Sequence, residues 1–295
     1  MGYRIGFDIG STTIKAVVLD ENNQICYKSY ERHKAQVRQK ALDKLVELKK
    51  YTKEPFKFAI SGSGALGLSE QGELPFVQEV FASATGVSKL YPETDCAIEL
   101  GGEDAKILFF QGSVEQRMNS TCAGGTGAFI DQMATLLNMS LEEMNEASLN
   151  YHRLYPIASR CGVFAKTDIQ PLINQGVDKC DLCASIFQAV VDQTITSLAQ
   201  GRKIEGNILF LGGPLYFMSG LRNRFVETLK LSDVQVNCPD TAINFVALGT
   251  AICADQEYTY DELYKALEDL VHAPAKLTES KPLFESEEDY QKFIE

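Results

Sequence analysis

A repeated strand–turn–strand unit is the feature that most constrains how this chain can fold. In each copy a strand ends in a glycine-containing turn, a second strand returns, and a third strand continues the hairpin pattern. The copies start about 93 residues apart and are too divergent to count as a sequence repeat. The expected strands are 3–8, 14–19 and 24–30 in the first copy, and 95–100, 106–111 and 114–118 in the second. The sequence therefore predicts an internal duplication of a lobe.

Further helices and strands are expected around the two hairpin units, because apolar residues recur at helical spacing or in short buried runs. The expected helices cover residues 35–50, 126–138, 162–175, 181–201 and 242–254, another begins near Tyr216, and further strands cover 56–61 and 207–211. This mixture predicts an α/β protein, and 295 residues suit two domains.

The domain boundaries follow from this pattern. Lobe I is expected to comprise residues 1–92 and 240–256, and lobe II residues 93–239. Residues 257–295 are rich in Glu, Asp, Lys and Tyr, so we interpret them as an acidic tail or linker. In a longer native chain this segment would lead into a further domain.

Charge and hydropathy narrow the function classes. The net charge of −12 with no offsetting basic stretch argues against nucleic-acid binding. No apolar run long enough to cross a bilayer and no signal peptide is recognisable, so a cytoplasmic protein without a membrane partner is expected. In a reducing compartment the eight cysteines are not expected to form disulfides. They are therefore either buried apolar residues or, in part, metal ligands.

The turn of the first unit has the chemistry of a phosphate-binding hairpin. Gly10 lets backbone N–H groups approach a phosphate, and the hydroxyls that follow it add donors. Asp8 is placed to hold Mg²⁺ through water, and Lys15 to reach a phosphate as a point charge. An ordinary hairpin with a polar turn would look similar. The residues expected to bind nucleotide here are Gly10, Ser11, Thr12, Thr13 and Lys15.

The second unit repeats this arrangement of acids and glycines, and two such hairpins can clamp a triphosphate from opposite sides. A third glycine pair follows strand 207–211, where backbone can lie flat against a purine, and small residues near Gly249 would let two lobes pack closely. The residues assigned to nucleotide binding are Gly101, Gly102, Glu103, Lys106, Gly212, Gly213, Pro214 and Gly249, and the catalytic carboxylates are predicted to be Asp8, Glu99 and Asp104.

In the order and spacing of these motifs, residues 1–254 resemble the superfamily of acetate and sugar kinases, heat-shock 70 proteins and actin. The resemblance implies two duplicated ribonuclease-H-like lobes with ATP or ADP in the cleft between them. It also implies Mg²⁺ near Asp8 and a lobe closure coupled to hydrolysis.

Two cysteines stand immediately before predicted helices. Cys122 precedes Gly124 and Gly125, and Cys161 follows Arg160. A helix N-terminus lowers the pKa of a thiol, and two helices aimed at one centre would stabilise an anionic iron–sulfur cluster. Alternatively, each is a small buried residue near a bend. Two cysteines make a four-thiolate site only if a symmetric dimer supplies two from each subunit.

The segments Thr121–Gly127 and Ser159–Ala165 resemble those of activators of 2-hydroxyacyl-CoA dehydratases and the related ATPase subunits of benzoyl-CoA reductase. The resemblance implies a homodimer with one 4Fe–4S cluster, bound by Cys122 and Cys161 of each subunit. Gly124 and Gly125, which follow Cys122, are also assigned to cofactor binding. The resemblance further implies that ATP hydrolysis drives one low-potential electron from ferredoxin or flavodoxin into a dehydratase-like iron–sulfur partner. Glu99 stands where Asp is common in the family, and Glu103 where Gln is common.

Other readings remain. Cys180 and Cys183 form a CxxC pair, which suggests zinc, redox chemistry or a cluster, yet apolar residues at core spacing follow and we favour core or incidental placement. A small-molecule kinase acting on a sugar or carboxylate, without a cluster, is the alternative function, with Asp104 as its candidate catalytic carboxylate. A non-catalytic nucleotide-dependent scaffold would explain the lobes but not the two helix-start cysteines.

Overall fold

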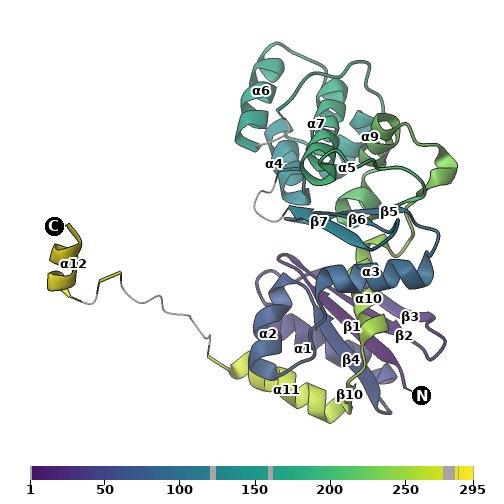
Figure 1. Cartoon of the computed structure of the whole chain (residues 1–295), viewed down its shortest axis with the longest axis vertical. Helices are drawn as coiled ribbons and strands as arrows, with labels where there is room; N and C mark the ends of the chain where they lie inside the picture. Colours follow the sequence, from purple (N-terminus) through teal and green to yellow (C-terminus); the bar gives the residue numbers. More distant parts are fainter. Residues whose placement is uncertain (1, 120–123, 159–161, 275–282, 285, 295) are drawn as a thin grey trace.

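The computed structural model describes residues 2–119, 124–158, 162–274, 283–284 and 286–294. Two five-stranded mixed sheets form the two lobes, which are stacked along the long axis of the molecule (Figure 1). The predicted duplication, and with it the α/β fold of two ribonuclease-H-like lobes, is confirmed. The sheet orders are β10-β4-β1-β2-β3 in lobe I and β7-β6-β5-β8-β9 in lobe II.

Equivalent strands occupy equivalent places in the two sheets. In each, the first strand of the hairpin unit pairs antiparallel with the second and parallel with a strand from later in the chain. The strands of lobe I are β1 (Arg4–Ile9), β2 (Thr13–Leu19), β3 (Ile25–Arg32), β4 (Phe56–Ser61) and β10 (Glu257–Tyr258). Those of lobe II are β5 (Cys96–Leu100), β6 (Ala105–Phe109), β7 (Glu115–Asn119), β8 (Ile208–Leu211) and β9 (Val236–Asn237).

Helices cover the outer faces of both sheets. Lobe I carries α1 (Val37–Glu47), α2 (Leu66–Gly72) and α11 (Tyr260–His272). Lobe II carries α4 (Gly127–Leu137), α5 (Leu141–Ser148), α6 (Gly162–Asn174), α7 (Lys179–Thr194), α8 (Gly213–Phe217) and α9 (Ser219–Leu229). The predicted helices 126–138 and 162–175 thus correspond to α4 and α6. The helix expected near Tyr216 is instead two, because the chain breaks at Met218 in an extended conformation.

Two helices lie between the lobes, α3 (Glu79–Leu90) and α10 (Phe245–Cys253) (Figure 1). An apolar cluster joins them to both sheets: it includes Val17 of lobe I, Leu211 of lobe II, and Phe245 of α10. The two helices approach closely, since a Cβ on Gly249 would lie 2.0 Å from the backbone oxygen of Ala82. The nucleotide cleft expected between the lobes is therefore bounded on one side by a packed interlobe core.

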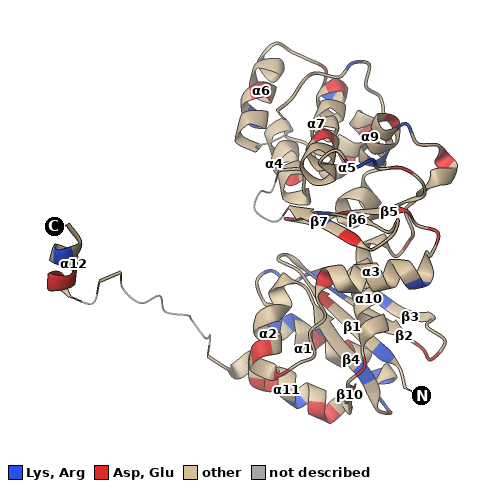
Figure 2. Cartoon of the chain, in the orientation of Figure 1, with Lys and Arg blue, Asp and Glu red and all other residues tan. Residues whose placement is uncertain are grey.

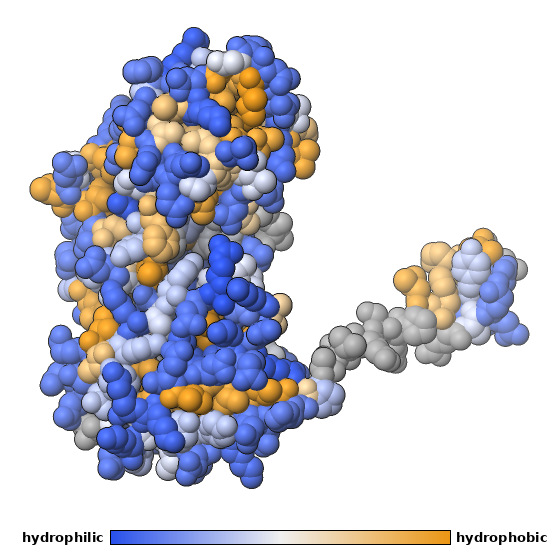
Figure 3. Space-filling model, turned by 180° about the vertical axis from the view of Figure 1, so that it is seen from behind, coloured by the Kyte–Doolittle hydropathy of each residue, from blue (hydrophilic) through white to orange (hydrophobic). Residues whose placement is uncertain are grey.

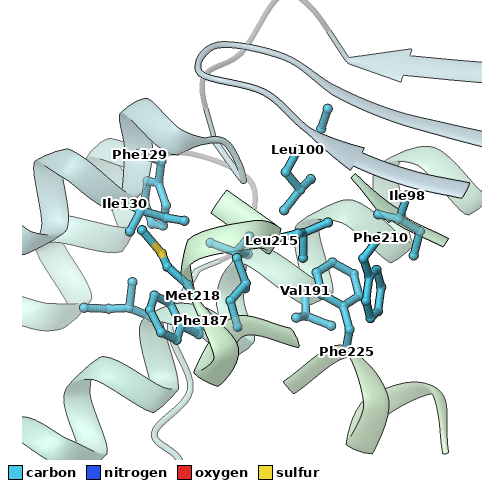
Figure 4. Packing of buried hydrophobic residues seen from close by; sticks show 14 of the residues in the cluster. Ile98, Leu100, Phe129, Ile130, Phe187, Val191, Phe210, Leu215, Met218 and Phe225 are labelled. Atoms are coloured by element: carbon cyan, nitrogen blue, oxygen red, sulfur yellow. The ribbon is translucent and has the colours of Figure 1, made fainter. Parts of the chain in front are cut away.

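The core of lobe II packs between its sheet and α4, α7 and α9. Figure 4 shows Phe210 of β8 facing Phe225 of α9, with ring centroids 5.6 Å apart. Among the residues that the structure describes, one helix, residues 179–199, is long and apolar enough to cross a membrane, whereas the sequence pattern indicated none. However, 72% of its apolar window is buried, because this helix forms the centre of the lobe II core.

The prediction of a tail from residue 257 onward was wrong for residues 257–272. β10 pairs with β4, and α11 buries Leu263, Leu267 and Leu270 in the core of lobe I. α11 begins with a capping box between Thr259 and Glu262, a signal that was present in the sequence. Beyond it, α12 (Glu287–Ile294) lies apart from the lobes and displays both apolar and hydrophilic side chains (Figure 3).

Charged residues of both signs are interspersed over the two lobes (Figure 2). The interspersion agrees with the absence of a basic stretch in the sequence. One group of opposite charges lies around the two hairpin turns, where Lys106 contacts three carboxylates. This group marks the candidate functional site.

Candidate functional site

Two cavities, of about 400 and 560 Å³, meet at the hairpin turns. The smaller cavity continues towards α8 and α10, and the larger towards α2 and the start of α3. Residues from both lobes form the wall that the cavities share: Asp8, Thr12, Thr13, Lys15, Glu99, Gly101, Gly102, Glu103 and Val246. The structure thus brings together most of the residues that the sequence assigned to phosphate binding and catalysis.

The first hairpin, between β1 and β2, presents a paired carboxylate and ammonium. Its turn is closed by the N–H of Gly10, which donates to the Thr13 oxygen at 2.9 Å. Asp8 and Lys15 are register partners, and the Lys15 Nζ donates to Asp8 Oδ2 at 2.7 Å. Burial alone would lower the pKa of Lys15, but the Asp8 carboxylate outweighs burial and raises that pKa. Lys15 is therefore a stable cation, and with one carboxylate partner it retains donors for a phosphate.

The second hairpin, between β5 and β6, repeats this geometry with different partners. The N–H of Gly101 donates to the Asp104 oxygen at 2.8 Å, and Glu99 is the register partner of Lys106. Lys106 Nζ lies 2.6 Å from Glu79, 2.7 Å from Asp104 and 3.6 Å from Glu99. Burial tends to lower the pKa of Lys106, but these carboxylates raise it well above its ordinary value. Lys106 is thus surrounded by carboxylates, unlike Lys15.

Glu99 is a buried carboxylate that, like Asp8, lines both cavities. Burial raises its pKa, Lys106 opposes that effect, and the neighbouring carboxylates add to it. The Ser83 hydroxyl of α3 donates to Glu99 Oε2 at 3.1 Å. A carboxylate so placed can accept a proton or contribute to binding a cation, as the sequence predicted for a catalytic position.

Two glycines with positive φ shape the edges of the site in the same way in each lobe. Gly62 follows β4 with φ +99°, and Gly212 follows β8 with φ +88°. A Cβ would come within 2.3 Å of the Ile9 oxygen at Gly62, and within 2.0 Å of the Leu100 oxygen at Gly212. Both positions therefore require glycine, because the parallel strand turns away directly against the end of the hairpin strand.

Different groups support the two turns from behind. Behind the first turn lies His33, buried, whose Nδ1 accepts from the N–H of Ala35 and whose Nε2 therefore donates to the Gly10 oxygen at 3.0 Å. Behind the second turn lies the start of α4. The N–H groups of Gly127 and Ala128 donate to the oxygens of Gly101 and Gly102 at 3.0 and 2.8 Å. The second turn is thus bonded directly to a helix of lobe II.

The smaller cavity is lined by the residues that the sequence assigned to the base of a nucleotide. Gly212, Gly213 and Pro214 lie there beside apolar side chains of α8 and α10. Tyr30 of lobe I and Phe217 of lobe II meet across it, with ring centroids 6.1 Å apart. At Gly102 a Cβ would make only an ordinary contact, 3.6 Å from the Thr12 hydroxyl oxygen. Backbone there can approach a phosphate closely.

Some predicted residues lie elsewhere. Gly124, Gly125 and Gly249 do not line either cavity: Gly125 packs on Gln193 of α7, and Gly249 on α3. Cys122 and Cys161, the predicted cluster ligands, lie outside the described residues. Within the described part of the chain, no group of three or more His, Cys, Asp or Glu side chains is placed to hold a metal ion.

The CxxC pair lies at the start of α7, where Cys183 belongs to the lobe II core and Cys180 is only partly buried. Cys183 is fully buried, 3.9 Å from the sulfur of Met139, and burial raises its pKa to about 12. Burial also raises the pKa of Cys180. Because metals bind the thiolate, this environment does not suit a metal site.

Sequence reasoning missed three residues of the site: Glu79, Ser83 and His33. The first two belong to α3, whose small and apolar residues gave a weak helical pattern. No motif distinguishes His33, since it contacts backbone rather than another functional side chain. Only the folded arrangement identifies these three residues.

With this geometry established, three comparisons with known proteins are informative. A model of the BadF/BadG/BcrA/BcrD ATPase family matches residues 5–254. The chain is 27% identical over 266 residues to the 2-hydroxyisocaproyl-CoA dehydratase activator of Clostridioides difficile, covering 88% of this chain and 96% of that protein.

Two solved structures are also similar. Component A of (R)-2-hydroxyglutaryl-CoA dehydratase from Acidaminococcus fermentans has a TM-score of 0.76 and 25% identity, covering 91% of this chain and 100% of that one. The activator of 2-hydroxyisocaproyl-CoA dehydratase from Clostridium difficile, with bound ADPNP, has a TM-score of 0.74 and 26% identity, covering 94% and 100%. The matched region includes both hairpins, both interlobe helices and the two predicted cluster cysteines.

Proposed function

This chain belongs to the BadF/BadG/BcrA/BcrD ATPase family, and from that membership we propose that it is a reductive activase. In this proposal a homodimer hydrolyses ATP and delivers one low-potential electron to an iron–sulfur enzyme of the 2-hydroxyacyl-CoA dehydratase type. Support for the partner comes from the similar proteins, which are named as activators of such dehydratases.

The observation that carries the proposal is the direct bonding of the second turn to α4. Gly101 and Gly102, which line both cavities, accept hydrogen bonds from Gly127 and Ala128 at the first turn of α4. That helix starts five residues after Cys122. A shift of the second turn on ATP hydrolysis would therefore be passed to the segment that carries a predicted cluster ligand. A kinase has no need of this connection.

The residues divide the work as follows. The triphosphate of the substrate ATP lies across the two turns, where Lys15 contacts a phosphate and Asp8 holds Mg²⁺ through water. Bound Mg²⁺ neutralises charge that develops on the phosphates. Glu99 and Asp104 face the cavities from the second hairpin and complete the acidic environment. The adenine lies against the Gly212-Gly213-Pro214 backbone.

The proposed cluster site consists of Cys122 and Cys161 from each of two subunits. A 4Fe–4S cluster there would supply a one-electron carrier of low potential. Two residues that follow Cys161 in the sequence support an interface between subunits: Val163 and Phe164, at the start of α6, are 70% and 65% exposed. Large apolar side chains so exposed are typical of a surface that a partner covers. Ferredoxin or flavodoxin would provide the electron.

Anaerobic purification tests the proposal. The wild-type protein should be a brown dimer with about four irons per dimer, the content of one cubane cluster. Cys122→Ala and Cys161→Ala should lose the iron while ATP hydrolysis continues. Cys26→Ala, which removes an exposed cysteine of β3, is the matched control and should keep the iron. A colourless wild-type protein, or iron retained in the double variant, would refute the cluster.

The larger cavity supports one alternative, a kinase for a sugar or a carboxylate. It lies on the other side of the shared wall from the base site, and Asp104 lines it, so it has the room and the carboxylate for a phosphoryl acceptor. ATP consumption stimulated by one such compound, with stoichiometric formation of its phosphorylated product, would favour the kinase. ATP hydrolysis to ADP and phosphate, indifferent to these compounds, would favour the activase.

A further inference from the structure

One face of α3 is attached to the second hairpin by two polar side chains, Glu79 and Ser83. They are four residues apart and so project from the same side of the helix. Glu79 Oε2 accepts from Lys106 Nζ at 2.6 Å, and the Ser83 hydroxyl donates to Glu99 Oε2 at 3.1 Å. Because Lys106 also contacts Glu99, both side chains act on the same carboxylate, one directly and one through the lysine.

We propose that Glu79 and Ser83 are positioning residues that fix the Glu99 carboxylate where the two cavities meet. The proposal rests on the proposed function, in which Glu99 serves ATP hydrolysis. It adds two residues from a helix that no nucleotide-binding motif includes, and a role for α3 other than apolar packing between the lobes.

The Lys106 ammonium is shared among the surrounding carboxylates. An ammonium has three N–H donors, and Lys106 has three carboxylates around it, of which Glu99 is the most distant. Without the charge of Glu79, the lysine would be free to move closer to Glu99 and Asp104. These two carboxylates would then be drawn towards Lys106 and away from the cavity. Glu79 therefore keeps Glu99 available to the substrate.

Ser83 acts on Glu99 directly, and its side chain is fully buried. Its hydroxyl restrains one oxygen of Glu99, and the long contact with Lys106 leaves the other oxygen less constrained. A hydroxyl at a fully buried position between two lobes has an energetic cost unless it is hydrogen-bonded. The hydrogen bond to Glu99 thus satisfies the buried hydroxyl and at the same time orients the carboxylate.

Packing alone does not account for these side chains. Val80 and Val87 already anchor α3 in the interlobe core. The corresponding lysine of the first hairpin, Lys15, is partly buried beside a single carboxylate and needs no ion pair with a helix. The additional carboxylate from α3, Glu79, is therefore specific to the second hairpin. In that hairpin Glu99 shares its cation, Lys106, with other carboxylates.

Steady-state ATP hydrolysis by the intact protein tests the proposal through Glu79→Gln and Ser83→Ala. Each should lower kcat about tenfold, since a hydrogen bond to a charged group is lost or weakened. The KM for ATP should stay within about twofold, because neither residue contacts the nucleotide in the proposed arrangement. Matched controls are Ser88→Ala, an exposed serine of α3, and Glu70→Gln, an exposed glutamate of α2, and both should behave as wild type.

The decisive experiment repeats the substitutions in a Glu99→Gln background. If Glu79 and Ser83 act through Glu99, neither substitution should change the remaining activity by more than about twofold. A purely structural role would lower activity equally in both backgrounds, and would refute the proposal. Ser83→Ala removes only one oxygen, so it keeps the test valid if Glu79→Gln fails to fold.

Failure of this inference is distinguishable from failure of the proposed function. If the wild-type protein does not hydrolyse ATP, the proposed function is wrong. If it does, and both variants retain wild-type kcat, the inference alone is wrong.

Discussion

The two hairpins have the same backbone geometry but differ in the number of carboxylates around their lysines. Gly10 and Gly101 close equivalent turns, and a carboxylate and a lysine face each other in equivalent register, Asp8 with Lys15 and Glu99 with Lys106. Yet Lys15 has one carboxylate partner, whereas Lys106 has three. The comparison teaches that duplication preserved the scaffold while the roles of the lysines separated: Lys15 is suited to phosphate, and Lys106 to holding carboxylates in place.

The two turns also differ in the groups that support them from behind. The first turn rests on His33, close to it in the same lobe. The second is bonded to α4 and, through Glu99 and Lys106, to α3. The first turn is therefore anchored locally, while the second is connected to two helices. A change at the nucleotide is expected to spread mainly through the second hairpin.

The largest effect is expected when the acid of the first hairpin is neutralised. Asp8→Asn should lower kcat for ATP hydrolysis at least about 100-fold, because the group that holds Mg²⁺ is lost. Glu99→Gln should lower it less, about 30-fold, since a positioned acid is lost but the metal is retained. Both rates are measured by phosphate release at saturating Mg²⁺. Equal losses in the two variants would show that the hairpins have not diverged in role.

Stability should respond in the opposite order. Lys106→Met leaves the buried carboxylate of Glu99 and the partly buried carboxylates of Glu79 and Asp104 without their cation. It should reduce the free energy of unfolding by about 3 kcal/mol, as for other broken buried ion pairs. Lys15→Met leaves one carboxylate and should cost less, about 1–2 kcal/mol. The main effect of Lys15→Met should be weaker ATP binding rather than lower stability. Urea denaturation at neutral pH measures both, and a greater loss for Lys15→Met would contradict the assigned roles.

The stability deficit of Lys106→Met should depend on pH, which distinguishes the role of Lys106 from that of Lys15. Burial raises the folded-state pKa of Glu99, and Lys106 opposes that shift. A carboxyl with a raised pKa stabilises the fold fully below its unfolded pKa, and that contribution is lost as pH rises through the folded pKa. Removing Lys106 raises the pKa further. The deficit of Lys106→Met should therefore narrow from pH 8 to mildly acidic pH. Lys106 itself stays charged throughout, since its pKa lies well above the ordinary value.

A deficit in Lys106→Met that is constant over this pH range would indicate that lost packing, rather than unpaired carboxylates, causes the destabilisation. The corresponding comparison with Lys15→Met serves as the control. Unfolding curves at each pH, with Mg²⁺ and nucleotide removed, provide the measurement.

Much of the fold could be predicted because strand alternation and turn residues are local signals. The strands of both hairpin units and the helices α4, α6 and α7 appear close to their expected places. α3 and α11 were not predicted. In α11 the capping box and the spacing of Leu263, Leu267 and Leu270 were available, but the surrounding charges suggested solvent. For α3 the pattern is weak, since small residues allow its close packing on α10.

The candidate site divides in the same way. Groups on the hairpins themselves were predictable, because β-strand geometry fixes which residues face each other within a unit. Glu79, Ser83 and His33 were not, since they meet the hairpins only through the tertiary fold. The acids of the second turn were recognised, but no local pattern showed that Lys106 is surrounded by carboxylates rather than open to phosphate.

The smallest expected effect concerns equivalent turn residues, Thr12 and Glu103. Both are exposed and line the two cavities, but Glu103 adds a negative charge beside the proposed phosphate site. Glu103→Gln should tighten ATP binding about twofold, because exposed charge interactions are typically worth ~0.2–1 kcal/mol. The gain should shrink between low and high salt as screening increases. Fluorescence titration with a nucleotide analogue measures it. Weaker binding in Glu103→Gln would instead mean that this carboxylate contributes to holding Mg²⁺, so that the second turn, like the first, would take part in binding the metal.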